Sequence, residues 1–447
     1  MDSVEDLGGE LTGAQPRIAI IGGGYAGVSA AVKLAELGHE SIIFEAGKVL
    51  GGRARRVDYR GTVLDNGQHI LSGAYTELLR MMALVGVPAD AWRRIPLSLN
   101  ILPDFALRAP KLPAPLHLLW ALLNAKGVSL NERWAAIRLM HALKRRQFSV
   151  DANCTVAQLL EQHRQPPRLI RNLWQPLTIS ALNTPLATAS AQVFANVLRD
   201  ALGSSRAASD LILPRVDLSA LFPAPAAVWL TARGSEVRLG SRINRVERID
   251  DHGASRWHAQ SAEQTYTAPA LFDRLIIAVA PHQLESLGLP AALLPQPLRV
   301  EPIYTVYLQY PQSVRLPHSM LGRVDGYCQW FFDREQLSGA TGLVAGVISA
   351  SGEHEALDQN ELALLVHQEL EAHIGHLPSP LWHKVIAEKF ATFACTANLQ
   401  RPTAETAMPG LYLAGDYIAC DYPATLEAAV RNGVRAAELV HASLSPH

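Results

Sequence analysis

Three glycines and an acid near the start of the chain have the types and spacing that dinucleotide binding requires. Gly22, Gly24 and Gly27 form a G-x-G-x-x-G turn, and Glu45 follows at roughly the twenty-residue offset of such sites. Gly22 allows a tight turn, Gly24 lets the backbone approach a pyrophosphate, and Gly27 lets a helix pack closely on a strand. A carboxylate at the Glu45 offset accepts hydrogen bonds from an unphosphorylated ribose. These residues predict a dinucleotide site without distinguishing NAD from FAD, and a purely structural glycine turn is the alternative.

The elements that must position this turn are a strand, a helix and a second strand. Residues 17–21 are a mostly β-branched run, and Ala30 and Leu34 repeat at helical spacing before Gly38, where a helix would stop. Residues 41–44 then form a second short apolar run that ends at the acid. The sequence therefore predicts a βαβ unit, in which the helix N-terminus offers free N–H groups and a partial positive charge to phosphates.

A second glycine turn, Gly51-Gly52-Arg53, follows the acidic strand end. On this pattern the chain resembles the flavin-dependent amine oxidase and carotenoid desaturase superfamily, in which G-G-R follows the same strand. The resemblance implies FAD as the cofactor, with Gly51 and Gly52 close to its pyrophosphate and Arg53 meeting the pyrophosphate charge. A basic, solvated loop is the alternative, and Arg55 and Arg56 are typical of plain surface charge.

Residues 65–69, with the sequence D-N-G-Q-H, form the next motif. The D-x-G pattern resembles the segment that lies beside the isoalloxazine in this superfamily, so Gly67 and Gln68 are expected at the cofactor. His69 has three interpretations: an acid, a flavin neighbour, or a neutral histidine that is hydrogen-bonded in the core. Asp65 takes part in the chemistry or, alternatively, forms a turn or caps a helix.

A strand ending in Gly415-Asp416 and a helix starting near Pro423 are expected close to the C-terminus. The resemblance implies that Gly415 and Asp416 contact the ribityl and phosphate region of FAD. It places Thr425 and Leu426 at a helix end that faces the pyrimidine edge of the flavin. N–H donors there would stabilise negative charge on reduced flavin and raise its potential.

Two further positions follow from the resemblance. The strand that carries a backbone contact to adenine matches the segment around Val237. Asp421 lies in a segment, 417–422, where the sequence departs from simple amine oxidases by being longer and more polar, so the resemblance does not extend to an amine-oxidase aromatic cage. Asp421 and His69 are the two candidate catalytic acids.

The D-N-G-Q-H motif, the D-Y-P-A-T-L-E-A-A-V segment at 421–430 and the apolar middle of the chain make it most similar to one branch of the superfamily. That branch is the hydroxysqualene dehydroxylases, squalene-associated desaturase-like enzymes of bacterial hopanoid synthesis. The resemblance implies a reductive reaction: reduced FAD delivers hydride to the allylic carbon of hydroxysqualene as the hydroxyl leaves as water, and squalene forms. Squalene-pathway synthases would hand over the substrate. An oxidative carotenoid or phytoene desaturase, an amine oxidase, and a lipid carrier that holds FAD only structurally are the alternatives.

A chain of 447 residues exceeds what one core usually holds, so two lobes are expected. The expected fold class is α/β, with a Rossmann-type FAD-binding domain and a mixed α+β substrate domain. The expected FAD-binding domain comprises residues 16–75, 227–283 and 386–447, and the substrate domain comprises residues 76–226 and 284–385.

The composition excludes several classes of partner. Forty basic against forty-one acidic side chains leave no field that would attract nucleic acid. Cys154, Cys328, Cys395 and Cys420 form no C-x-x-C pair, which favours a reducing cytoplasm and argues against a zinc or other metal site. The first fifteen residues lack the pattern of an export signal, and no apolar run reaches the roughly eighteen residues of a membrane span. A cytoplasmic protein is therefore expected.

The region from residue 97 to residue 185 is rich in Leu, Ala, Pro and Trp and is expected to be helical. Its nearly continuous apolar run, 116–123, predicts a core helix, with a helix dipping into the lipid interface as the alternative. Nearby cations, among them Lys126, Arg138 and Lys144, suit anionic headgroups or an ordinary solvated face. Such a lobe suits a long isoprenoid, which must be held mainly by buried area at about 25 cal/mol per Å².

Overall fold

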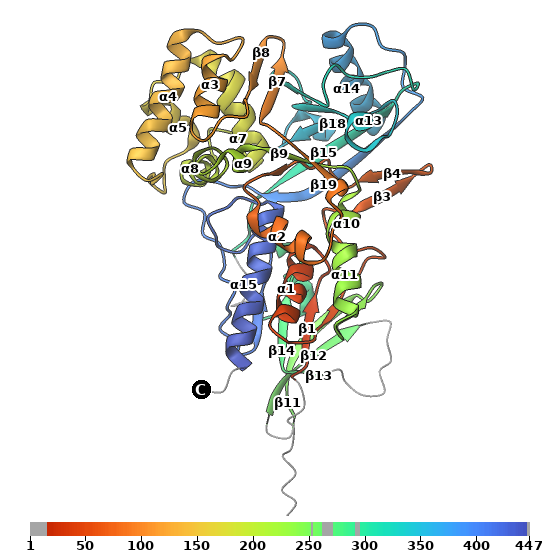
Figure 1. Cartoon of the computed structure of the whole chain (residues 1–447). Coiled ribbons are helices and arrows are strands. Elements are labelled where there is room, and N and C mark those ends of the chain that lie inside the picture. Colours follow the sequence, from red (N-terminus) through yellow and green to blue (C-terminus); the bar gives the residue numbers. More distant parts are fainter. Residues whose placement is uncertain (1–15, 252–253, 262–270, 291–295, 445–447) are drawn as a thin grey trace, which may run out of the picture.

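A five-stranded parallel sheet forms the lower part of the molecule as drawn in Figure 1. The computed structural model describes residues 16–251, 254–261, 271–290 and 296–444. In spatial order the strands are β10 (Glu236–Arg238), β2 (Ile42–Phe44), β1 (Ile18–Ile21), β14 (Arg274–Ile277) and β20 (Leu411–Leu413). All neighbouring pairs are parallel, and β1 is central. Ligands of such sheets bind beyond the carboxyl ends of the strands, which is where the first glycine turn lies.

Three long helices accompany this sheet: α1 (Tyr25–Glu36), α11 (Pro223–Thr231) and α15 (Leu426–Leu444). Figure 1 shows α1 between the other two, and it contacts both of them. A Cβ added to Gly433 of α15 would lie 2.2 Å from the carbonyl oxygen of Ala26, so only glycine permits this close crossing of α15 and α1. The predicted strand, helix and strand around the first glycine turn are confirmed as β1, α1 and β2.

A seven-stranded sheet lies above the first one in Figure 1. Its strands in spatial order are β19 (Trp382–Phe393), β15 (Val300–Gln309), β18 (Leu343–Ser349), β17 (Trp330–Asp333), β16 (Met320–Arg323), β7 (Ser98–Leu102) and β8 (Phe105–Arg108). Neighbouring strands are antiparallel except β16 and β7. Helix α14 (Gln359–Ile374) packs against β15 and β19, and α13 (Arg334–Ser338) packs against β17 and β18.

A group of helices stands beside this second sheet, at the upper left of Figure 1. They are α3 (Leu116–Leu123), α4 (Leu130–Arg145), α5 (Val156–Gln162), α6 (Pro167–Leu169), a π-helical turn η2 (Ile170–Trp174), α7 (Gln175–Leu182), α8 (Ala191–Leu198), a second π-helical turn η3 (Arg199–Gly203) and α9 (Arg206–Ser209). The expectation that 116–123 is a core helix is wrong. Half of α3 is exposed, including Trp120 at 53%.

Short elements complete the fold. They are the hairpin β3 (Arg56–Tyr59) and β4 (Thr62–Asp65); the sheet β5 (Leu71–Ser72), β9 (Leu211–Pro214) and β6 (Trp92–Ile95); the sheet β11 (Ile243–Asp251), β12 (Ala254–Ser261) and β13 (Leu271–Phe272); helices α2 (Thr76–Leu84), α10 (Leu218–Leu221) and α12 (Pro281–Leu284); and the 3-10 turns η1 (Ala89–Ala91), η4 (Glu285–Leu287) and η6 (Glu353–Ala356). Among the helices that the structure describes, none is both long and apolar enough to cross a bilayer.

Candidate functional site

A cavity of about 920 Å³ joins the carboxyl end of the five-stranded sheet to one face of the seven-stranded sheet. The glycine turns, Glu45, Arg53 and Asp416 line its polar end. Apolar side chains of β7, β16, β17 and β18 line the other end, among them Leu99, Met320, Trp330, Phe332 and Val347. The volume lies near the top of the roughly 300–1,000 Å³ range of small-molecule sites.

The first glycine turn packs tightly except where it faces the cavity. Gly22 has φ of 109°, and a Cβ there would lie 2.5 Å from the carbonyl oxygen of Ala278. A Cβ on Gly27 would lie 1.9 Å from the carbonyl oxygen of Gly22. At Gly24 the nearest atom to an added Cβ is the Cα of Gly52, at 3.8 Å. Gly22 and Gly27 therefore fix the turn, and Gly24 leaves open space at the cavity.

Helix α1 begins directly at this open space. Gly24 precedes its first turn, and no side chain caps it. The first N–H groups of a helix have no partner within the helix, and they carry a partial positive charge. Tyr25 and Ala26 of this first turn line the cavity. The arrangement suits an anionic group.

Glu45 ties the first glycine turn to the loop after β2. Its Oε2 accepts a hydrogen bond from the N–H of Gly23 at 2.7 Å, and its Oε1 accepts one from the N–H of Gly47 at 2.6 Å. Each carboxylate oxygen has a second lone pair, and Glu45 lines the cavity. A hydrogen bond from a ribose hydroxyl is therefore compatible with this structural role.

The second glycine turn lies against the first. The N–H of Gly51 donates to the carbonyl of Gly23 at 2.9 Å, and Gly51 and Gly52 have φ of 122° and 61°. The turn presents Arg53, whose Nη2 lies 2.6 Å from Oδ1 of Asp416 while its Nη1 donates to the carbonyl of Ala391 at 2.6 Å. The side chain of Asp416 is 9% exposed and that of Arg53 is 34% exposed. The structure thus joins the second glycine turn to the Gly415-Asp416 motif through one ion pair.

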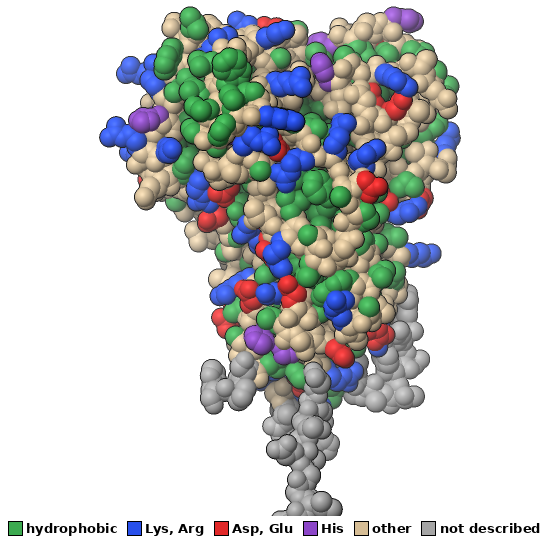
Figure 2. All heavy atoms as spheres, in the orientation of Figure 1, with side chains coloured by type: hydrophobic (Ala, Val, Ile, Leu, Met, Phe, Trp, Pro, Cys, Tyr) green, Lys and Arg blue, Asp and Glu red, His purple; other side chains and the backbone are tan. Residues whose placement is uncertain are grey.

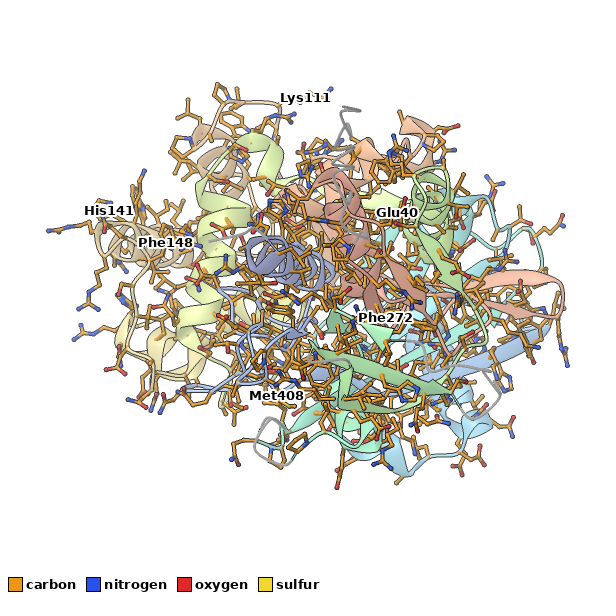
Figure 3. The ribbon with its side chains drawn as sticks, turned by 90° about the horizontal axis from the view of Figure 1, so that it is seen from below. Glu40, Lys111, His141, Phe148, Phe272 and Met408 are labelled. Atoms are coloured by element: carbon orange, nitrogen blue, oxygen red, sulfur yellow. The ribbon has the colours of Figure 1, made fainter. Side chains whose placement is uncertain are left out.

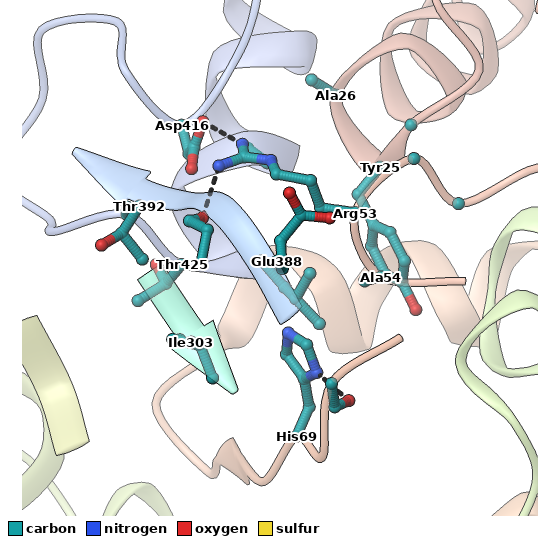
Figure 4. A pocket seen from close by; sticks show the side chains of 18 of the residues that line it. Tyr25, Ala26, Arg53, Ala54, His69, Ile303, Glu388, Thr392, Asp416 and Thr425 are labelled. Carbon is teal, nitrogen blue, oxygen red and sulfur yellow. Dashed lines mark hydrogen bonds and ion pairs between the residues drawn. The ribbon is translucent and has the colours of Figure 1, made fainter. Parts of the chain in front are cut away.

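Glu388 lies near this ion pair (Figure 4), and Asn66 connects Glu388 to Arg53. The side-chain amide of Asn66 donates to the carbonyl of Arg53 at 2.9 Å and to Oε2 of Glu388 at 2.8 Å. Burial lowers the pKa of the Arg53 guanidinium, but the negative charges of Asp416 and Glu388 outweigh burial and raise that pKa overall. Arg53 is therefore a permanent cation at the wall of the cavity.

The last helix, α15, also begins at the cavity. It starts at Leu426, slightly later than the predicted start near Pro423, and Thr425 Oγ1 accepts a hydrogen bond from the N–H of Ala428 at 3.1 Å. Thr425 and Leu426 both line the cavity. The N-termini of α1 and α15 therefore contribute N–H groups to the same space.

Asp65 and Arg334 form a buried pair behind the D-N-G-Q-H segment. Asp65 Oδ1 accepts from the N–H of Leu218, the first residue of α10, at 2.9 Å, and its Oδ2 lies 3.4 Å from Nη1 of Arg334. Burial raises the pKa of Asp65, and the charge of Arg334 opposes this shift. Arg334 also hydrogen-bonds to Gln68, which lines the cavity together with Gly67. Asp65 therefore makes a helix-capping contact at the start of α10, and through Arg334 it also supports Gln68.

His69 reaches the cavity from this segment (Figure 4). Its Nδ1 lies 2.7 Å from the carbonyl of Gly67. Because a carbonyl only accepts, Nδ1 carries the proton, and Nε2 has no partner among the residues that the structure describes. Burial lowers the pKa of His69 most strongly, and the Gly67 carbonyl and the charge of Asp65 act in the opposite direction. The neutral ring therefore presents an acceptor to the cavity, and the protonated ring presents a strong acid.

Two predicted residues lie away from the cavity lining. Val237 sits in the middle of β10, opposite Ile43, and the chain reaches the cavity only at residues 241–243, beyond the strand. The Asp421 side chain is 68% exposed and lies 3.6 Å from Nη2 of Arg199. The structure therefore does not bring Asp421 to the reacting region, because its loop turns the carboxylate toward solvent.

Three residues that line the cavity were not predicted from the sequence. Glu388 belongs to β19, where three apolar residues, 385–387, precede Glu388 and Lys389, so no alternation in the sequence marks Glu388 as a lining residue. Asp200 and Tyr422 meet across the cavity wall, where the Tyr422 hydroxyl donates to Oδ2 of Asp200 at 2.9 Å. Arg199 lowers the pKa of Asp200 against burial, and nothing local in the sequence predicts this contact.

The polar end of the cavity fits a flavin dinucleotide. It offers a glycine cradle that a Cβ at Gly22 or Gly27 would disrupt, two helix N-termini and the cation of Arg53. The buried hydroxyl of Tyr417, which lines the cavity, has no hydrogen-bond partner within the described part of the chain. Within that same part, no group of three or more His, Cys, Asp or Glu side chains could hold a metal ion.

Comparison with known proteins agrees with this geometry. The family model described as "Flavin containing amine oxidoreductase" matches residues 25–441. The chain is 29% identical over 433 residues to a hydroxysqualene dehydroxylase of Zymomonas mobilis, covering 94% of this chain and 98% of that one. It is 29% identical over 438 residues to a hydroxysqualene dehydroxylase of Rhodopseudomonas palustris, covering 95% and 98%.

A solved structure supports the fold. An oxidoreductase from Methanosarcina mazei superposes with a TM-score of 0.74 at 14% identity, covering 95% of this chain and all of that one. At this identity the likeness bears on the fold, and the match extends through both sheets. The expected α/β fold with a Rossmann-type sheet and a mixed second region is confirmed.

Proposed function

Because the chain belongs to the flavin containing amine oxidoreductase family and is an FAD-dependent oxidoreductase, we propose that it reduces hydroxysqualene to squalene. The observation that carries the proposal is the cavity, which continues from the predicted dinucleotide-binding motifs into a chamber of apolar side chains and has His69 in its lining. In this proposal, residues 16–75, 227–283 and 386–447 hold FAD, and residues 76–226 and 284–385 hold the substrate.

The residues proposed to hold FAD come from several separate parts of the chain. They are Gly22, Gly24, Gly27, Glu45, Gly51, Gly52, Arg53, Gly67, Gln68, Gly415, Asp416, Thr425 and Leu426. The α1 N-terminus and Arg53 provide the positive charge that the pyrophosphate needs. The resemblance implied an adenine contact at Val237. Ile243 is proposed to make this contact instead, because Ile243 lines the cavity and Val237 does not.

The reaction replaces a C–O bond by a C–H bond. FAD, when bound and reduced, supplies hydride to the allylic carbon, and the hydroxyl needs a proton to leave as water. The chain must orient that carbon within about 3.5 Å of the flavin, exclude water and deliver the proton. Each of these tasks has a candidate group in the cavity.

His69 is the proposed proton donor. With Nδ1 held by the Gly67 carbonyl, protonation places the second proton on Nε2, the nitrogen that has no hydrogen-bond partner in the part of the chain that the structure describes. Because burial lowers the pKa of this ring, its protonated form gives up the proton readily. The neutral ring then accepts a hydrogen bond from the water that leaves.

The apolar end is proposed to hold the hydrocarbon. Leu99, Phe332 and Val347 line it with no charge among them, so binding there depends on area removed from water. The Trp330 indole N–H donates to Ser180 Oγ at 2.8 Å, which satisfies the polar atom of this wall. An apolar wall whose polar atom is already hydrogen-bonded excludes water from the reacting carbon.

Anaerobic mixing of the reduced holoprotein with hydroxysqualene tests the proposal. Reoxidation of the flavin absorbance together with an equivalent amount of squalene supports it. An unchanged spectrum with hydroxysqualene, combined with flavin reduction by a carotenoid precursor or an amine, would favour an oxidative enzyme. Retained FAD that responds to none of these compounds would favour a lipid carrier.

A further inference from the structure

Helix α3 presents an apolar face to solvent. Leu116, Leu119, Trp120 and Leu123 are 53, 40, 53 and 38% exposed. Their spacing of three and four residues places them on one side of the helix. Helices at a protein surface normally turn polar residues outward. The outward side of α3 is instead its apolar side.

The start of α4 extends this face. Leu130 and Trp134 are 66 and 55% exposed. The Arg133 guanidinium donates to the carbonyls of Leu123 and Ala125 at 2.5 and 2.8 Å, which fixes the end of α3 against α4. We call the whole surface the α3–α4 face. Its exposed apolar residues are Leu112, Leu116, Leu119, Trp120, Leu123, Leu130 and Trp134.

Cations surround the α3–α4 face. Between residues 105 and 150 the sequence has eight Lys and Arg residues and one acid, Glu132, in a chain whose net charge is −1. Glu132 is buried and caps α4 through the N–H of Ser129. Lys111, Lys126 and Arg138 are exposed, and none forms an ion pair with a residue that the structure describes. The positive charge is therefore available to a partner.

The figures show the same distribution. In Figure 2 hydrophobic side chains gather over α3 and α4, with Lys and Arg side chains around them. In Figure 3, viewed at 90° to Figure 1, Lys111 and His141 lie at the periphery of the molecule and point away from its centre.

We propose that the α3–α4 face docks on a lipid bilayer with anionic headgroups. Exposed leucines and tryptophans enter the boundary between headgroups and acyl chains, where the indole N–H keeps a polar partner. Lysine and arginine at the margin meet the phosphates. A protein partner fits less well, because protein interfaces are depleted in lysine and a matching acidic, apolar surface would be needed.

The α3–α4 face lies over a wall of the cavity. His117, on the buried side of α3, has its Nε2 2.9 Å from Oγ of Ser209, and Ser209 lines the cavity. Leu118 and Leu122 pack on the same core cluster as Leu99, which also lines the cavity. Helix α3 therefore lies between the docked surface and the apolar chamber. Docking goes beyond the proposed function, because it does not depend on which isoprenoid is the substrate.

Co-sedimentation of the holoprotein with vesicles tests the proposal without any substrate. We expect binding to vesicles of phosphatidylglycerol and phosphatidylcholine, and at least tenfold weaker binding to phosphatidylcholine alone. The double variant Trp120→Gln/Leu123→Gln should bind at least tenfold more weakly. The triple variant Lys111→Gln/Lys126→Gln/Arg138→Gln should lose on the order of a hundredfold at low salt, at about fivefold per cation. The substituted side chains are exposed, so the fold should be kept.

Matched variants elsewhere provide the controls. Val228→Gln/Leu364→Gln removes exposed apolar side chains from α11 and α14, and Arg60→Gln/Arg215→Gln/Arg435→Gln removes three exposed cations. Both should bind vesicles like the unaltered protein. Equal binding to the two vesicle types, equal loss in the control variants, or no vesicle binding would overturn the proposal. Conversion of a dimer to a monomer by the α3–α4 variants, with vesicle binding unchanged, would assign the face to a second copy of the chain instead.

Discussion

Replacing Arg53 by alanine tests the junction between the motifs. Arg53 comes from the second glycine turn and Asp416 from the loop after β20, 363 residues apart, yet Nη2 and Oδ1 lie 2.6 Å from each other. The variant leaves the Asp416 carboxylate, 9% exposed, at the polar end of the cavity without its cation. It also frees the carbonyl of Ala391, which Arg53 holds at 2.6 Å.

The expected cost lies between two limits. Removing one partner of a buried ion pair costs about 3–5 kcal/mol, and an exposed pair contributes only about 0–1 kcal/mol. Because the Arg53 side chain is 34% exposed, we expect the free energy of unfolding without FAD to fall by about 2–3 kcal/mol. Loss of the proposed charge-assisted contact of Arg53 with the pyrophosphate should weaken FAD binding roughly ten- to a hundredfold.

Thermal unfolding without FAD and titration with FAD by flavin fluorescence measure both effects. Arg56→Ala is the control, because its ion pair with Asp58 is exposed at 38 and 66% and should contribute less than about 1 kcal/mol. The double variant Arg53→Ala/Asp416→Asn should be more stable than the sum of the single effects implies. An Arg53→Ala variant that binds FAD and unfolds like Arg56→Ala would refute the role given to the Arg53–Asp416 ion pair.

Three further predictions concern the turn and the histidine. Gly27→Ala should abolish FAD retention or weaken it at least a hundredfold, because its Cβ would lie 1.9 Å from the carbonyl oxygen of Gly22. Gly61→Ala is the control: its φ of 76° strains the turn between β3 and β4, but its Cβ meets no atom within 4 Å and lies outside the cavity lining, so this variant should lose some stability and keep FAD. Equal flavin content in both variants would contradict this. His69→Asn, which can still donate to the Gly67 carbonyl, should slow squalene formation by roughly a hundredfold or more with FAD bound, and near-normal turnover would remove His69 from the mechanism. Burial lowers the pKa of His69, so the protonated ring that donates the proton is lost as pH rises through a pKa below the usual histidine value. Single-turnover rates should therefore increase as the pH is lowered from about 8 to about 5.5. His69→Asn should lose this pH dependence.

The local parts of the fold could be predicted from the sequence. The first βαβ unit follows from a β-branched run, helical spacing and a stop glycine, and these signals act within about thirty residues. Gly22, Gly27, Gly51 and Gly52 have contacts or φ values that only glycine permits, whereas Gly24 leaves open space at the cavity.

Pairings between distant segments could not be predicted. The Arg53–Asp416 ion pair and the Asn66–Glu388 hydrogen bond join residues more than 300 positions apart. Asp421 precedes Tyr422, which lines the cavity, but the loop directs the Asp421 carboxylate toward solvent. The roles of the individual residues toward FAD stay predictions.

Periodicity could not decide which side of α3 faces the core. The one polar residue of α3, His117, lies on its buried side, so the usual rule that polar residues face solvent points to the wrong side of this helix. Tertiary contacts bury His117 and Ala121 and leave Trp120 in solvent. The distribution of cations around the α3–α4 face was visible in the sequence, but its relation to the exposed leucines appears only in the fold.

The most direct test of the central claim follows an isotope from the flavin to the product. The reduced holoprotein is equilibrated in D₂O, mixed anaerobically with hydroxysqualene, and the squalene is analysed by mass spectrometry. If the cavity places the allylic carbon against reduced FAD, squalene should carry one deuterium at the former hydroxyl position, in step with flavin reoxidation. Squalene without deuterium, or flavin that stays reduced while hydroxysqualene is bound, would contradict the account.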